Sequence, residues 1–330
     1  MQTDLRARLA RSERFIREIR AFFSTRGHVE VETPCLCPFL IPEPAIEVFR
    51  TDFHPAAGGS VETYLAPSPE LWMKRLLAAG SGSIFQLARS FRDGDFGGPL
   101  HNPEFRLLEW YTVGASYLDQ VAATEELLAR LLTADSPGTA AKHLRPPFRV
   151  MSMEEAFRGL AGTDLAACTG TAAMIEAARS LGCDARDDWT WEQAFHGAFL
   201  AKVEPGLPRD RPLVLADWPA AVPTTARRRP GTPWAERWEL YLDGVEVANC
   251  YTEETDPAEV DRFLREEALR KLRTARVVPR VDEGYGRLFA DGFPACSGVA
   301  LGVDRLEMAV RGERSLEGVI NFPLSAIVRG

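Results

Sequence analysis

The order of strand and helix patterns restricts the fold of this chain more than any single motif does. Residues 83–112 alternate as two strands joined by a glycine-rich loop. A second hairpin follows at residues 237–250, with Asp243-Gly244 as its turn. Residues 152–204, between the hairpins, have helical spacing and little strand signal. The sequence therefore predicts an α+β fold: a mixed, mostly antiparallel sheet flanked by helices and interrupted by a helical insertion.

The remaining patterns place other elements around this sheet. Apolar residues recur at helical spacing up to Gly27, which predicts a helix over residues 4–26. Prolines then enforce an extended connection through residue 45, and residues 133–147 form the best linker candidate. We expect one domain over residues 1–330 with the insertion at about residues 148–210. Strands are expected at residues 28–32, 61–66, 83–92, 105–112, 213–217, 237–242 and 245–250, and further helices at 69–77, 117–133 and 257–273. A final strand that leads into a helix is expected over residues 296–311.

The composition indicates a globular protein without a membrane span. Hydrophobic residues make up 45% of the chain and charged residues 26%. The net charge of −8 argues against general attraction to nucleic-acid phosphates, so any RNA contact would be local. Arginines interrupt the N-terminal segment, which is neither a signal peptide nor a membrane span, and we expect a cytoplasmic protein. The six cysteines form no CxxC pair and the five histidines no HExxH motif, so neither zinc nor a disulfide framework is indicated.

The second strand of the first hairpin carries groups that can bind a nucleotide and an amine. Alternation puts Phe105, Glu109 and Tyr111 on one face and Trp110 on the other. An aromatic ring can stack on a nucleobase, a carboxylate can bind an ammonium group, and Arg92 on the adjoining strand can bind a phosphate. The alternative is a half-exposed hairpin with ordinary surface charges.

Three segments, in family order, resemble the signature motifs of class II aminoacyl-tRNA synthetases of the lysine subclass. GHVEVETP, which ends at Pro34, is similar to motif 1; residues 91–111, with HNPEF, resemble motif 2; and SGVALGVDRLEM at residues 297–308 resembles motif 3. The resemblance implies that Pro34 lies at a homodimer interface. It also implies that Arg92 and Arg305 are catalytic residues that bind ATP.

A fourth block, residues 236–254, resembles the family segment that supplies acidic magnesium and substrate ligands. It matches Glu239, Glu246, Asn249 and Glu253, and we expect Glu246 and Glu253 to hold Mg²⁺. These two glutamates are seven residues apart, an odd spacing, so a regular strand would point them to opposite faces and the chain must bulge or turn between them. Without the resemblance, both would be ordinary solvated surface residues.

The implied amino-acid site combines the hairpin face with a loop that precedes a helix. YLAPSPELWMKRLL at residues 64–77 resembles the substrate loop of the family. Alternatively, Glu70 only complements the dipole of the helix N-terminus. The implied substrate-binding residues are Ser68, Pro69, Glu70, Glu109, Tyr111, Asn249, Glu253 and Ala300, and the implied ATP-binding residues are Arg92, Asp93, Asn102, Phe105, Glu246, Val247, Gly302 and Arg305.

The whole-length pattern, with SPE at residues 68–70 and CSGVALGVDR at 296–305, resembles the elongation factor P lysine ligase family. A lysyl-tRNA synthetase carries an N-terminal OB-fold that reads the anticodon, whereas motif 1 begins here at about residue 27, so no anticodon-dependent tRNA binding is expected. The resemblance implies activation of lysine or β-lysine with ATP and Mg²⁺, and transfer to a lysine side chain of elongation factor P. A tRNA-charging paralogue and an inactive paralogue that senses lysine or ATP are the alternatives.

The sequence departs from the family pattern at several positions. Ala300 stands where lysyl-tRNA synthetases carry glycine, and we hypothesise that its methyl group favours β-lysine over α-lysine. After the motif 2 arginine, the usual Asn-Glu is replaced by Asp93-Gly94, followed by Asp95, in the loop expected to recognise adenine. Cys250 stands where a glycine is usual, which alters the wall of the expected substrate site.

Overall fold

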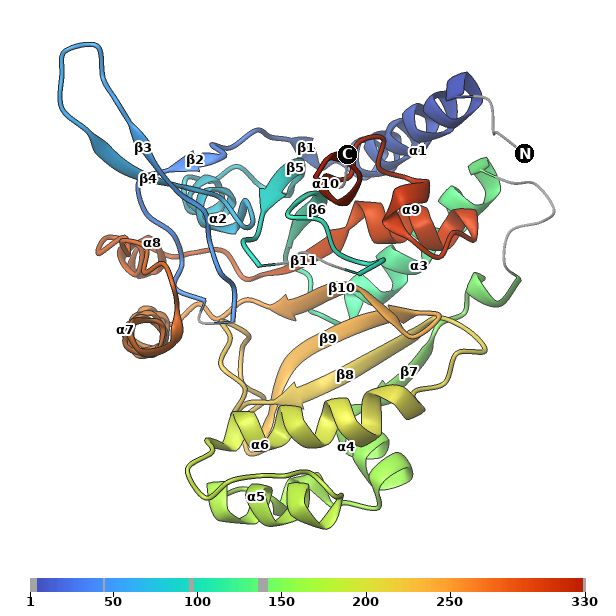
Figure 1. Ribbon diagram of the computed structural model, residues 1–330, viewed down its shortest axis with the longest axis vertical. Helices are drawn as coiled ribbons and strands as arrows, with labels where there is room; N and C mark the ends of the chain where they lie inside the picture. Colours follow the sequence, from blue (N-terminus) through green and yellow to red (C-terminus); the bar gives the residue numbers. More distant parts are fainter. Residues whose placement is uncertain (1–4, 44, 95–97, 136–141, 329–330) are drawn as a thin grey trace.

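A large twisted sheet forms the centre of the molecule (Figure 1). The computed structural model describes residues 5–43, 45–94, 98–135 and 142–328. In the described residues the sheet has eight strands in the order β1-β5-β6-β11-β10-β9-β8-β7. The pairs β1–β5 and β7–β8 are parallel and the other pairs antiparallel, which confirms the predicted mixed, mostly antiparallel sheet. The strands are β1 (Val29–Glu30), β5 (Ile84–Phe91), β6 (Glu104–Val113), β7 (Arg149–Ser152), β8 (Leu213–Pro219), β9 (Trp234–Leu242), β10 (Val245–Thr252) and β11 (Cys296–Gly302).

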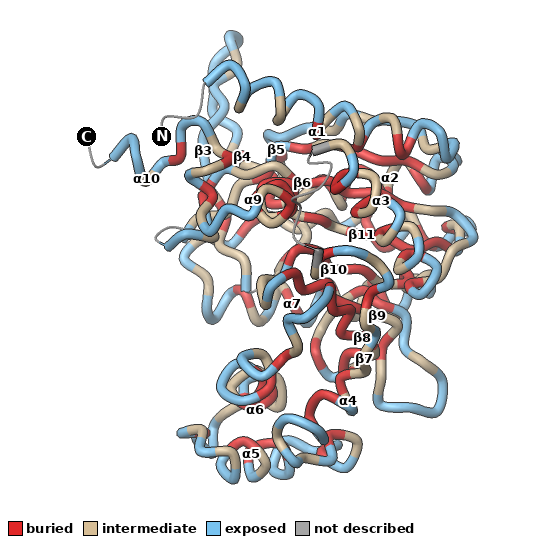
Figure 2. The backbone as a smooth tube through the Cα atoms, turned by 90° about the vertical axis from the view of Figure 1, so that its right-hand side faces the viewer, coloured by how far each residue is buried: buried red, intermediate tan, exposed pale blue. Residues whose placement is uncertain are grey.

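Helices cover both faces of this sheet and define its two sides. On one face, α1 (Leu5–Thr25), α3 (Asp119–Asp135) and α9 (Val303–Arg311) bury apolar side chains against Leu108, Trp110 and Trp238. On the other, α2 (Glu70–Ala78), α7 (Pro257–Thr274) and α8 (Arg287–Ala290) pack over the ends of β5, β6 and β11. Buried residues accordingly run along the central strands in Figure 2, while the outer faces of the helices are exposed. The second face is only partly covered by apolar contacts, which leaves room there for polar groups.

The helical insertion lies against the far edge of the sheet (Figure 1). Its helices α4 (Met153–Ala156), α5 (Thr171–Ser180) and α6 (Trp191–Ala198) share one hydrophobic cluster with Leu215 of β8 and Tyr241 of β9. The segment also contains β7, a strand in a region with little predicted strand signal. Four residues are too few for an alternating pattern to be detected in the sequence. β7 forms because it pairs in parallel with β8 at the edge of the sheet.

A small three-stranded sheet and the C-terminal segment complete the described structure. Its strands β2 (Leu36–Cys37), β4 (Val61–Leu65) and β3 (Arg50–Phe53) pair in the order β2-β4-β3; the sequence predicted only β4. The chain ends near the helix α10 (Leu324–Ile327). Pro44, Asp95 and the middle of the predicted linker lie outside the described residues. None of the described helices combines the length and apolar character needed to cross a bilayer.

Candidate active site

A row of four paired positions, three of them polar, crosses β6, β11, β10 and β9. Glu109 on β6, Ala300 on β11, Asn249 on β10 and Glu239 on β9 are successive cross-strand partners. Side chains at paired positions project from the same face of a sheet and lie next to one another. Trp110 points into the opposite core, as the predicted alternation of the hairpin requires. Residues from four strands therefore share one site although they are far apart in the sequence.

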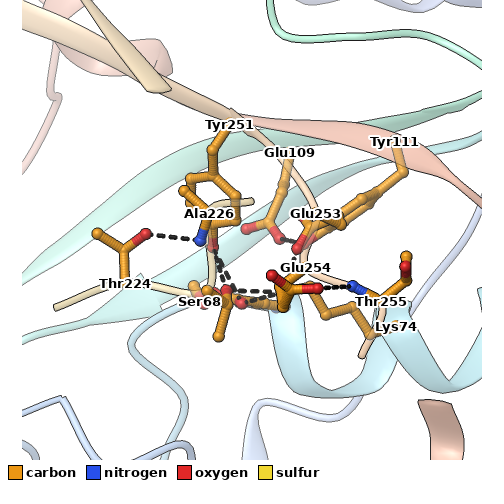
Figure 3. Close-up of polar contacts among 12 residues, drawn as sticks. Ser68, Lys74, Glu109, Tyr111, Thr224, Ala226, Tyr251, Glu253, Glu254 and Thr255 are labelled. Carbon is orange, nitrogen blue, oxygen red and sulfur yellow. Dashed lines mark hydrogen bonds and ion pairs between the residues drawn. The ribbon is translucent and has the colours of Figure 1, made fainter. Parts of the chain in front are cut away.

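Three carboxylates from separate elements gather around one buried lysine, Lys74, and Figure 3 labels two of them, Glu109 and Glu253. Lys74 Nζ lies 2.6 Å from Glu70 Oε1 and 2.7 Å from Glu253 Oε2. The Tyr251 hydroxyl donates to the same Glu70 oxygen at 3.1 Å. Glu109 completes the group from β6, and we refer to Glu70, Glu109 and Glu253 as the carboxylate cluster. Its members come from α2, from β6 and from the segment directly after β10.

Burial makes ionisation of Glu109 and Glu253 costly. Burial, followed by the nearby charge of Glu70, raises the pKa of Glu109 well above its usual range. Burial also raises the pKa of Glu253 to about 7, although the charge of Lys74 opposes the shift. Glu109 Oε2 and Glu253 Oε1 are buried and have no hydrogen-bond partner among the described residues. Because an unpaired buried carboxylate oxygen is unfavourable, these two atoms favour the binding of a group that donates hydrogen bonds and carries positive charge.

Gly298 allows two of these side chains to approach the sheet closely. It is paired with Tyr111 on one side and Tyr251 on the other. A Cβ atom at this position would lie 2.5 Å from a ring carbon of Tyr111 and 2.8 Å from Glu253 Oε1. The Tyr111 hydroxyl in turn donates to Glu109 Oε1 at 2.7 Å. The glycine of the predicted motif 3 is therefore part of the wall of this site.

The two arginines expected to bind phosphates lie at the end of the sheet where β6 begins. Arg92 follows β5, and its Cζ lies 5.3 Å from the centroid of the Phe105 ring. Its Nε is buried and has no hydrogen-bond partner in the described structure. Arg305, in the first turn of α9, donates to the Glu246 carbonyl oxygen at 2.9 Å and lies 3.0 Å from His101 Nε2. Arginine side chains near the start of β6 and carboxylates further along this strand suit a ligand with phosphates at one end and an amine at the other.

The structure gives Glu246 and Glu253, the predicted magnesium pair, different neighbours. β10 shifts register between Glu246 and Ala248, which confirms the expected bulge. However, Glu253 lies seven residues further on, about 20 Å along an extended chain, and its ion pair is with Lys74. Burial and the charge of Glu246 raise the pKa of Glu239 to about 7, which places these two carboxyl groups near each other. A pair of neighbouring carboxylates fits Mg²⁺, which prefers oxygen ligands and would relieve their repulsion.

Comparison with known proteins agrees with this arrangement. A family model described as tRNA synthetases class II (D, K and N) matches residues 1–326. The chain belongs to this family. A relative named elongation factor P–(R)-β-lysine ligase from Yersinia enterocolitica is 37% identical over 330 residues, covering 96% of this chain and 95% of the relative. One of the same name from Hamiltonella defensa is 35% identical and covers 94% and 92%, and a homologue of this ligase from Aquifex aeolicus is 35% identical and covers 92% and 94%.

Other residues expected from the class II motifs already use their polar atoms in hydrogen bonds within the protein. Ser68 Oγ accepts from the backbone N–H of Glu70 at 3.3 Å, and Pro69 precedes the first turn of α2. Both amide atoms of Asn102 are already used: Nδ2 donates to the Glu104 carbonyl at 2.5 Å and Oδ1 accepts from Leu324 N at 2.9 Å. Asn102 thus anchors the C-terminal segment and would need to exchange these bonds to contact ATP.

Asp93, Asn249 and Val247 have partners within the class II domain as well. The Asp93 side chain lies 3.4 Å from Arg276, and Asn249 Oδ1 accepts from Arg237 Nε at 3.1 Å. Val247 is buried, and its carbonyl oxygen faces Gly302, where an added Cβ would lie 3.7 Å from it. Val247 and Gly302 therefore contribute backbone rather than side chains to this part of the site.

Sequence reasoning missed three charged or polar members of the site. Lys74 follows Glu70 by four residues on a predicted helix, a spacing that places both on one helix face. Tyr251 lies two residues after Asn249 on the same strand face. Glu43, in the proline-rich connection, carries a pKa raised to about 7 by burial and by the charge of Glu70. The first two could have been found from spacing, whereas the connection around Glu43 has no periodic signal.

Proposed function

We propose that this class II protein activates lysine or β-lysine with ATP and transfers it to a lysine side chain of elongation factor P. Two buried carboxylates, Glu109 and Glu253, each present an unpaired oxygen in the site, and this observation carries the proposal. An amino acid with two ammonium groups satisfies both atoms. The names of relatives that match over nearly the whole chain support the same substrate and acceptor.

In the proposed first step, the substrate carboxylate attacks the α-phosphate of ATP. A bond forms between the carboxylate oxygen and phosphorus, and pyrophosphate leaves. Arg92 and Arg305 hold the phosphates and balance the charge that develops, and Phe105 offers its ring to adenine. The carboxylate cluster meanwhile holds the ammonium groups, so the substrate carboxylate is presented to the phosphate in a fixed orientation.

Glu239 and Glu246 are the residues that would hold magnesium in this proposal. When bound, Mg²⁺ supplies charge neutralisation for the phosphates. Two donors, Arg237 at 2.7 Å and the Tyr241 hydroxyl at 2.8 Å, fix the position of the Glu239 carboxylate. In the second step, a lysine amine of the acceptor attacks the acyl carbon of the adenylate and AMP leaves.

The test is ATP–pyrophosphate exchange with α-lysine and with β-lysine, followed by mass spectrometry of elongation factor P incubated with the protein and ATP. Exchange together with a lysine-sized mass gain is expected. If exchange occurred without the mass gain and labelled lysine were transferred to tRNA, the acceptor would be tRNA and not elongation factor P. No exchange with either isomer would contradict an enzyme and favour a regulatory paralogue that binds lysine or ATP.

Ala300→Gly is expected to lower the ratio of β-lysine to α-lysine activation by about tenfold. The Ala300 methyl group lies between the paired positions Glu109 and Asn249, so its removal enlarges the site where the amino groups bind. Exchange rates measured with both isomers give the ratio. An unchanged ratio would show that Ala300 does not determine the preference between the two isomers.

We further propose that the protein is a cytoplasmic homodimer. Val29 and Leu36, on either side of Pro34, are 57% and 43% exposed, so motif 1 presents apolar surface that a second subunit would cover. Light scattering is expected to give twice the 36.6 kDa mass of one chain. A mass of one chain at micromolar concentration would contradict the dimer.

A further inference from the structure

Lys74 is a fully buried lysine in the middle of the proposed amino-acid site. Its exposed fraction is 0%, which is rare for lysine unless the ammonium group is paired. Its Nζ contacts Glu70 and Glu253 and also lies 3.3 Å from Thr225 Oγ1. Burial lowers the pKa of Lys74, but the carboxylates of Glu253 and Glu70 outweigh this effect and hold it well above the usual value. The side chain is therefore a permanent cation.

The surroundings of Lys74 are predominantly acidic. Nζ lies 5.5 Å from the centroid of the Tyr251 ring, and burial keeps the Tyr251 hydroxyl protonated by raising its pKa. Glu43, the other acid nearby, is also close to Lys271 and Arg92, which balance its charge. The titratable groups that face Lys74 are Glu70 from α2, Glu109 from β6, Tyr251 from β10, Glu253 after it, Tyr285 before α8, Cys296 from β11 and Glu43 from the proline-rich connection.

We propose that Lys74 is the internal counter-cation of the amino-acid site, a positioning residue that holds the side chains of Glu70 and Glu253 in place for the substrate. This inference rests on the proposed function. Lys74 occupies Glu70 Oε1 and Glu253 Oε2, and the buried oxygens Glu109 Oε2 and Glu253 Oε1 are left for a substrate with two ammonium groups. Lys74 thereby fills the space between Glu70 and Glu253 that a further cation would otherwise enter.

The position of Lys74 on α2 explains how it can act without meeting the substrate. It bonds Glu70 Oε1 and Glu253 Oε2, whereas Glu253 Oε1 faces Gly298 and has no partner in the described structure. One oxygen of Glu253 is thus occupied by Lys74 and the other is available for a ligand. Loss of the lysine would free the carboxylate to rotate and to take up a proton.

Lys74→Met tests this role because methionine keeps the length of the side chain and removes its charge. We expect the KM for the lysine isomer in pyrophosphate exchange to rise by about 100-fold, with the KM for ATP unchanged. The charge of Lys74 lowers the pKa of Glu253, so its loss raises that pKa above about 7. The acidic limb of the kcat/KM profile should therefore move upward by about one pH unit. Lys74→Arg retains the charge and should keep the limb at its wild-type position.

Lys271→Met is the matched control. Lys271 is also buried, but its Nζ donates to the backbone carbonyls of Glu43 and Ile46, at 2.8 and 2.5 Å, rather than to the cluster. It should lower Tm and leave the KM for the lysine isomer at the wild-type value. The inference would be overturned if Lys74→Met kept the wild-type acidic limb of the pH profile, or if it behaved like Lys271→Met. Pyrophosphate exchange by the wild type would still support the proposed function in that case. If the wild type shows no exchange, calorimetric titration with β-lysine decides: equal affinity of wild type and Lys74→Met overturns the inference, and weaker binding by the variant supports it.

Discussion

Glu239→Gln is expected to reduce pyrophosphate exchange by about 100- to 1,000-fold and to raise the Mg²⁺ concentration that gives half-maximal rate. The carboxylate is buried, accepts hydrogen bonds from Arg237 and Tyr241, and lies near Glu246. Glutamine keeps the shape and one acceptor oxygen but removes the charge that attracts the cation. A magnesium titration of the exchange rate at fixed ATP measures the effect.

Glu253→Gln is the control that separates the two assignments of the metal site. Its partner is Lys74, so the substitution should raise the KM for lysine and leave the magnesium dependence unchanged. The opposite pattern, in which Glu253→Gln and not Glu239→Gln raises the magnesium requirement, would restore the pair Glu246 and Glu253. Circular dichroism of both variants excludes unfolding as the common cause.

The sheet could be predicted where strands are long or have a diagnostic turn. The hairpin at Asp243-Gly244 and the alternation of β6 are local signals, and the structure reproduces both. The strands β2, β3 and β7 have two to four residues each, and each exists only because a neighbouring strand offers backbone partners. Such pairing depends on tertiary contacts, so it cannot be predicted from a short stretch of the sequence.

The site was predictable in membership but not in charge balance. Alternation and motif resemblance selected Glu109, Tyr111 and Glu253, which the structure gathers at one place. The partner of Glu246 in the metal site stays a prediction. Seven residues separate Glu246 from both Glu239 and Glu253, and the spacing alone cannot choose between a neighbouring strand and the far end of the same strand. Lys74 was overlooked because a lysine on a predicted amphipathic helix is normally exposed. Its burial follows from the acids around it, and two of these, Glu109 and Glu253, come from distant parts of the chain.

Gly298→Ala is expected to lower kcat/KM for the lysine isomer by about 100-fold and to cost about 1 to 3 kcal/mol of stability. The added methyl group would meet the Tyr111 ring at 2.5 Å and Glu253 Oε1 at 2.8 Å, and Tyr111 is itself buried, so neither side chain can stay in place. The loss should appear in the KM for the amino acid and spare the KM for ATP, because Arg92 lies beside Phe105 near the start of β6 and Arg305 contacts the Glu246 carbonyl oxygen, both away from Gly298.

The matched control for this substitution is Gly159→Ala in the helical insertion, where an added Cβ meets no atom within 4 Å. That variant should retain the wild-type exchange rate and Tm. The effect at Gly298 would then come from the Tyr111 ring and Glu253 Oε1, which the added methyl group meets there, and not from the methyl group itself. Exchange rates at varied lysine and varied ATP separate the two KM values. If Gly298→Ala activated lysine with the wild-type KM, the space above Gly298 would not be where the substrate amine binds. The two unpaired oxygens of Glu109 and Glu253 would then need another partner, and the proposed amino-acid site would have to move along β6 toward Phe105.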